Sequence, residues 1–118
     1  MARAKRIHHV TTMVTDLEKA DDFYGALLGL PRIHRPDLAS KGLWYEVDGT
    51  QFHVIRGDTI DAESGRHTAF EVDDLQATVE KVEALGLPAW GGTQVDGWVR
   101  KHCRDPFGNL VELMQRLD

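Results

Sequence analysis

The chain carries the same pattern of apolar and polar positions twice. Residues 9–31 read HVTTMVTDLEKADDFYGALLGLP, and residues 66–88 read RHTAFEVDDLQATVEKVEALGLP. Each copy opens with alternating, β-branched positions typical of a strand and continues with apolar residues at helical spacing. His67 aligns with His9, and after a one-residue gap in the helical part the Gly-Leu-Pro endings align as well. The chain is therefore predicted to be a duplicated module.

Turn residues divide each copy into one helix and four strands, in the order βαβββ. In the first copy we expect strands at about residues 6–15, 31–34, 42–47 and 51–55, and a helix at about 17–28. In the second copy we expect strands at about 67–72, 89–90, 97–104 and 110–115, and a helix at about 75–85. Asp48-Gly49 predicts a hairpin turn. Leu75, Val79, Val82 and Leu85 are expected on the buried stripe of the second helix.

Such a repeat cannot close its own hydrophobic core, so the copies are expected to pack together and to meet across a shared groove. The prediction is one α+β domain over residues 1–118, with module one at about 6–56, a linker at about 57–65 and module two at about 66–116. Any chemistry is expected in the groove.

Composition narrows the function classes. With 19 acidic and 14 basic residues, the net charge of −5 argues against a nucleic-acid surface. We expect no membrane span and no signal peptide, because no apolar run is long enough. The single cysteine, Cys103, favours a reducing compartment, so a cytoplasmic location is expected.

Strand alternation places four metal-binding residue types on the groove faces. They lie at equivalent positions on the first and last strand of each module: His9, His53, His67 and Glu112. A lone histidine on a strand is more often structural, but four such residues in one register favour a metal site. Imidazole and carboxylate ligands suit Zn, Ni, Co, Mn or Fe(II) and leave coordination sites for substrate or water.

Further groove-side residues are candidates for a substrate pocket and for proton transfer. The pocket candidates are Thr11, Met13, Trp44, Trp98, Arg100 and Met114. Arg100 or Arg104 could clamp an anionic substrate, and His102 could move a proton. The alternative for the strand at residues 97–104, which carries Arg100, His102 and Arg104, is an edge strand with solvated charges. Cys103 is predicted to point away from the groove.

Three stretches of the sequence resemble the vicinal oxygen chelate superfamily. They are the first repeat, with its Phe23-Tyr24 and Leu28-Gly29-Leu30, and the segments HTAFEVDDL and DPFGNLVEL. That superfamily includes glyoxalase I, bleomycin-resistance proteins, extradiol dioxygenases, methylmalonyl-CoA epimerase and fosfomycin-resistance enzymes. The resemblance implies two βαβββ modules forming a curved mixed sheet around a metal cleft, commonly in a homodimer. It also implies that His9, His67 and Glu112 are metal ligands. His53 departs from the glutamate that glyoxalase I-like members usually carry.

The resemblance favours a divalent-metal-dependent lyase or isomerase of the glyoxalase type, acting on a small substrate with two neighbouring oxygens. The metal would act as a Lewis acid, Glu112 would alternate between ligand and base, and His102 is the second candidate base. One alternative is an Fe(II) extradiol-type dioxygenase using His9, His67 and Glu112. The other is a non-catalytic binding or resistance protein, although bleomycin-binding relatives generally lack the metal set.

Replacing His53 with alanine should sharply lower the metal content of protein purified without added metal, because an imidazole ligand is lost. Elemental analysis of the purified variant measures this. Full metal occupancy together with unchanged activity would remove His53 from the site.

Overall fold

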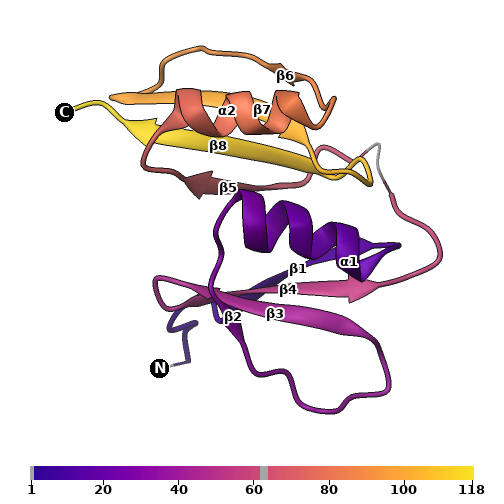
Figure 1. Cartoon of the computed structure of the whole chain (residues 1–118). Helices are drawn as coiled ribbons and strands as arrows, with labels where there is room; N and C mark the ends of the chain where they lie inside the picture. Colours follow the sequence, from indigo (N-terminus) through magenta and orange to yellow (C-terminus); the bar gives the residue numbers. More distant parts are fainter. Residues whose placement is uncertain (1, 62–63) are drawn as a thin grey trace. The chain divides into compact units, whose positions relative to one another are not determined.

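The computed structural model describes residues 2–61 and 64–118, which form two compact units that divide between Thr59 and Ile60 (Figure 1). The first unit contains β1 (His9–Val14), α1 (Leu17–Ala20), the π-helix η1 (Asp21–Leu27), β2 (Arg32–Ile33), β3 (Gly42–Val47) and β4 (Thr50–Arg56). The second contains β5 (His67–Glu71), α2 (Leu75–Ala84), β6 (Ala89–Trp90), β7 (Trp98–Arg104) and β8 (Leu110–Arg116). The predicted βαβββ order is confirmed in both halves.

Each unit has a four-stranded mixed sheet with the same topology. The strand orders are β1-β4-β3-β2 and β5-β8-β7-β6. The first and last strands of each module pair in parallel, and the other pairs are antiparallel. The hairpin between β3 and β4 turns at Asp48 and Gly49, which both have positive φ, as two-residue hairpins require. This topology places residues from the two ends of each module side by side.

The first helix differs from the expected single α-helix. After one α-helical turn it continues as a π-helix, and the Leu28 amide donates to the carbonyl of Phe23, five residues earlier. A π-helical ring accommodates one residue more than an α-helical ring. The first repeat has one residue more than the second in this segment. The wider turn therefore absorbs the extra residue and keeps Phe23 and Tyr24 buried.

Matching residues begin and end the two helices. Asp16 accepts a hydrogen bond from the Lys19 amide, and Asp74 accepts one from the Ala77 amide, so an aspartate is the N-cap of each helix. Gly29 (φ 74°) follows the first helix and Gly86 (φ 82°) follows the second. These left-handed positions favour glycine and stop each helix at its expected place.

Apolar side chains between helix and sheet form the core of each unit. Phe23, Tyr24, Tyr45, Phe52 and Val54 are buried in the first unit. Phe70, Leu75, Val82, Cys103, Val111 and Leu113 are buried in the second. Leu85 was wrongly expected in this core. It follows the last helical residue, Ala84, and is 56% exposed, because the chain turns away there toward Gly86.

In the described part of the chain, each helix is too short or too polar to cross a bilayer.

A buried tyrosine ties the π-helix to the first sheet. The Tyr45 hydroxyl donates to Asp21 Oδ1 at 2.6 Å, and Arg32 pairs with the same oxygen at 3.1 Å. The Tyr45 hydrogen bond, supported by Arg32, lowers the pKa of Asp21 against the opposing effect of burial. The carboxylate therefore stabilises the folded state only while it is ionised.

Tyr45→Phe should lower the free energy of unfolding by about 1–2 kcal/mol at neutral pH, the range for a hydrogen bond to a charged group that is partly solvent-exposed. Because the folded-state pKa of Asp21 lies below its unfolded value, the contribution is present above pH ~4 and is lost as the pH falls further. Urea titrations at several pH values measure the difference between wild type and variant. A difference that stays constant down to pH ~3 would contradict this account. Arg32→Gln is the comparison variant: it removes the ion pair with Asp21 and the guanidinium over the Tyr45 ring, and it keeps the tyrosine hydroxyl.

Candidate metal centre

Three donor side chains meet on the face of the second sheet that lies opposite α2. His67 is on β5, Glu112 on the neighbouring β8, and His102 on β7 directly opposite Glu112. Alternation along β7 and β8 turns Cys103, Val111 and Leu113 toward the core and leaves these donors on the other face. The sheet topology, rather than proximity in sequence, brings the three together.

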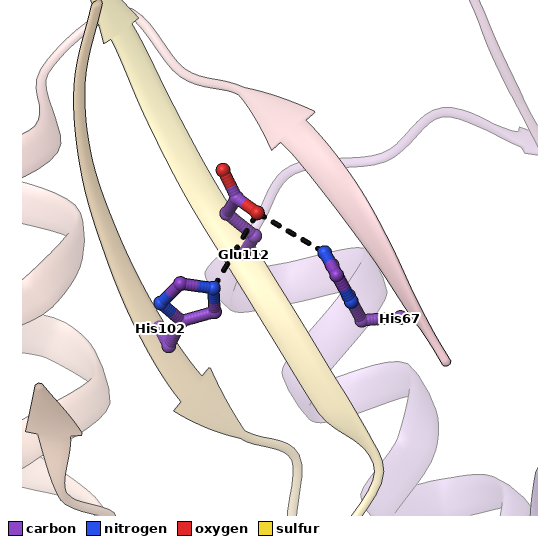
Figure 2. Close-up of side chains that lie close together, drawn as sticks. All are labelled: His67, His102 and Glu112. Atoms are coloured by element: carbon purple, nitrogen blue, oxygen red, sulfur yellow. Dashed lines mark hydrogen bonds and ion pairs between the residues drawn. The ribbon is translucent and has the colours of Figure 1, made fainter. Parts of the chain in front are cut away.

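Figure 2 shows Glu112 between the two imidazoles. Its Oε1 atom lies 3.1 Å from His67 Nε2 and 3.4 Å from His102 Nε2. One ligand atom from each residue lies within 4.8 Å of the others. Glu112 is 7% exposed. Within residues 2–61 and 64–118, this is the one cluster of three or more potential metal ligands.

The surroundings of His67 fit a bound cation. Its Nδ1 lies 3.0 Å from the carbonyl oxygen of Gly65, which can only accept, so Nδ1 carries a proton. In the neutral ring Nε2 then has a lone pair, and this lone pair faces a carboxylate oxygen. Two acceptors at that distance require either a proton on one of them or a metal ion between them. A backbone carbonyl that orients a ligand histidine is also usual in metal sites.

His102 is held beside the cluster by the end of β6 and the glycine that follows it. The ring stacks on Trp90 with centroids 6.1 Å apart and planes 22° apart. A Cβ at Gly91 would lie 3.3 Å from His102 Nδ1, and Gly91 has φ 91°. The glycine therefore lets the backbone pass close to the ring. Sequence reasoning assigned His102 only to proton transfer; its place opposite Glu112 makes it a candidate ligand too.

The first unit holds its own predicted ligands in a stack. His53 lies between His9 and Trp44, with both centroid distances 4.1 Å and interplanar angles of 17° and 2°. Its Nε2 is 2.8 Å from Gln51 Oε1, a contact that sequence reasoning missed. Burial, and then the nearby His9, lower the pKa of His53 and favour the neutral ring that metals require.

The remaining candidates for the substrate pocket also lie on the sheet faces opposite the helices. Thr11 and Met13 are on β1, beside His53 and Ile55 of β4. Arg100 of β7 is opposite Met114 of β8. Trp98, at the start of β7, lies under the guanidinium of Arg116 at 5.5 Å.

Thus the predicted ligands come together as two groups, His9 with His53 and His67 with Glu112. A single metal bound by all four stays a prediction, since the groups belong to different units.

A separate open pocket of about 480 Å³ lies on the helix side of the second sheet. It is lined by Leu75, Gln76, Val79, Glu80, Glu83, Val99, Lys101 and Gln115. Val99 and Lys101 alternate with Arg100 and His102, so this pocket and the donor cluster are on opposite faces of the sheet. The cavity is therefore distinct from the candidate metal centre.

The family model of the Glyoxalase/Bleomycin resistance protein/Dioxygenase superfamily matches residues 6–113. The chain belongs to this superfamily. The match covers both repeats, in agreement with the resemblance found in the sequence. It establishes the family of the chain and leaves the reaction to be inferred from the site.

Curated and solved relatives agree with this assignment. A lactoylglutathione lyase from Neisseria meningitidis is 32% identical, over 94% of this chain and 91% of that protein. The fosfomycin resistance protein FosX from Listeria monocytogenes, solved as a mutant with Mn(II) and 1S,2S-dihydroxypropylphosphonic acid, has a TM-score of 0.79 at 21% identity, covering 98% of this chain and 94% of that one. A glyoxalase family protein from Enterococcus faecalis has a TM-score of 0.69 at 23% identity, covering 93% and 97%. The two solved structures show the shared fold.

Glu112→Gln should weaken divalent metal binding by more than about tenfold, because it replaces an anionic ligand with a neutral amide of the same shape. Zinc titration with elemental analysis measures the affinity and the stoichiometry. Glu71→Gln is the matched control: Glu71 is an exposed carboxylate on β5, in the same register as His67. Unchanged metal affinity in Glu112→Gln would contradict the assignment of this cluster.

Proposed function

We propose that the protein is a divalent-metal-dependent enzyme, a glyoxalase-like lyase or isomerase that acts on a small substrate through two neighbouring oxygens. The observation that carries the proposal is the position of His67 Nε2, which faces Glu112 Oε1 at 3.1 Å while Nδ1 is held by Gly65. Membership of the superfamily and the lactoylglutathione lyase relative support the same reaction class.

His67, His102 and Glu112 are proposed to hold the metal, with His9 and His53 as further ligands from the first unit. Nitrogen and oxygen donors suit Zn, Ni, Co, Mn or Fe(II). The bound metal would supply Lewis-acid chemistry, polarising the substrate oxygens and stabilising negative charge on them. The Mn(II) in the FosX structure supports a divalent ion in this fold.

Glu112 is proposed to move the substrate proton. Its Oε1 faces the two histidines, and its Oε2 is directed toward Arg100 at 3.8 Å. One oxygen can therefore remain with the ligand cluster while the other takes a proton from a substrate carbon. His102 is the second proton-transfer candidate, because Trp90 and the Gly91 backbone restrict its ring. The small exposure of Glu112 limits competition from water.

A second candidate function is an extradiol-type dioxygenase. Two histidines and one carboxylate on one face of the second sheet are the ligand types of Fe(II) oxygenases with open coordination positions. His9 would replace His102 if the metal is shared with the first unit. This reaction needs iron, oxygen and a catechol, and those requirements separate it from the lyase.

Formation of lactoylglutathione from methylglyoxal and glutathione by protein reconstituted separately with Zn, Ni, Co, Mn and Fe(II) tests the proposal. We expect activity that depends on the metal, disappears with a chelator and falls at least about a hundredfold in Glu112→Gln, which removes both a ligand and a base. Oxygen uptake with a catechol, confined to the iron form, would favour the dioxygenase. Stoichiometric binding by metal-stripped protein without any turnover would indicate a binding or resistance protein and overturn the proposal.

A further inference from the structure

Arg100 lies beside the candidate metal centre without a hydrogen bond to it. It precedes His102 by two residues on β7, so both side chains are on the donor face of the sheet. Its Nη1 atom is 3.8 Å from Glu112 Oε2, within ion-pair range but too far for a hydrogen bond. Its Nε donates to the carbonyl of Thr93 at 3.2 Å, which holds the guanidinium next to the cluster.

The charges around Glu112 change when a metal binds. Without a metal, the single carboxylate faces Arg100 on one oxygen and two histidines on the other. With a divalent ion on the histidine side, one negative charge would lie among three positive charges, two from the metal and one from Arg100. Positive groups on the two sides of one carboxylate repel each other in a partly buried site. An anionic group between the metal and Arg100 would relieve the repulsion.

We propose that Arg100 binds an anionic group of the substrate, so that the site takes small acids whose carboxylate or phosphonate lies next to the metal-chelating oxygens. This inference rests on the proposed metal-dependent function and names its substrate class. Arginine suits the role because its planar donors match the oxygens of a carboxylate or phosphonate. Thr93 fixes Arg100 through Nε, and Nη1 faces the cluster.

The neighbouring arginines on this face have structural contacts instead. Arg104 Nη1 donates to the Gly108 carbonyl at 2.9 Å, and its guanidinium lies 5.9 Å from the Trp90 ring centre. The guanidinium of Arg116 lies over the Trp98 ring, where β7 begins and β8 ends. Arg100 is the arginine with an ion-pair contact to Glu112 among the described residues. Arg116 therefore provides a control with the same charge on the same face.

The test uses Co(II)-loaded full-length protein and three small probes: lactate, 1-hydroxyethylphosphonate and neutral lactamide. The visible absorption of Co(II) reports when a probe enters its coordination sphere. Wild type should bind at least one acid more tightly than lactamide. Arg100→Gln should lower the affinity for that acid by about tenfold or more and change the affinity for lactamide by less than about twofold, because only the acid loses a charged partner. The acid with the larger loss identifies the group as carboxylate or phosphonate.

Arg116→Gln should leave all three affinities unchanged, and Arg100→Lys should restore part of the acid affinity because it keeps the charge. Co(II) uptake and thermal unfolding of each variant show that the cluster and the fold are intact. The inference is overturned if wild type binds Co(II) but has equal affinities for the acids and the amide. It is also overturned if Arg100→Gln lowers these affinities by the same factor. In both cases the metal-dependent function stands. If wild type takes up no Co(II), both are overturned.

Discussion

Parallel pairing between the first and last strands of each module is the constraint on which the site depends. β1 pairs with β4 and β5 pairs with β8, so residues far apart in sequence become neighbours. Thr11 is opposite His53, and Ala69 is opposite Glu112, which leaves His9 and His67 diagonal to the candidate ligand on the adjacent strand. A shift of one residue in either pair would turn these side chains to the core face. The helices secure the register by covering the apolar face of each sheet.

Much of this arrangement could be predicted from the sequence, because alternation and duplication reinforce each other. Aligning the repeats placed His9 at the position equivalent to His67, and strand alternation placed Glu112 on the groove face. The hairpin at Asp48-Gly49 followed from turn chemistry alone. These predictions depend on backbone periodicity, which a single sequence displays directly.

Other features depend on packing, which periodicity does not encode. The one-residue gap between the repeats was visible, but the π-helix that absorbs it follows from the need to keep both Phe23 and Tyr24 buried. Leu85 continued the helical pattern although the helix had already ended. The contact between His102 and Glu112 required the exact register of β7 against β8, which is set through the loop at residues 105–109. There the buried Asp105 accepts hydrogen bonds from the amides of Phe107 and Asn109.

The cross-strand neighbour differs between the two modules, and so does the type of candidate ligand that it faces. His53 is opposite Trp44 on β3, and Glu112 is opposite His102 on β7. Trp44 stacks flat on the His53 ring, and its electron-rich face would repel a carboxylate at that position. Glu112 instead lies among two imidazoles and the guanidinium of Arg100, where a carboxylate is favoured. The duplicated backbone thus provides equivalent positions, and the cross-strand partner determines whether each suits an imidazole or a carboxylate.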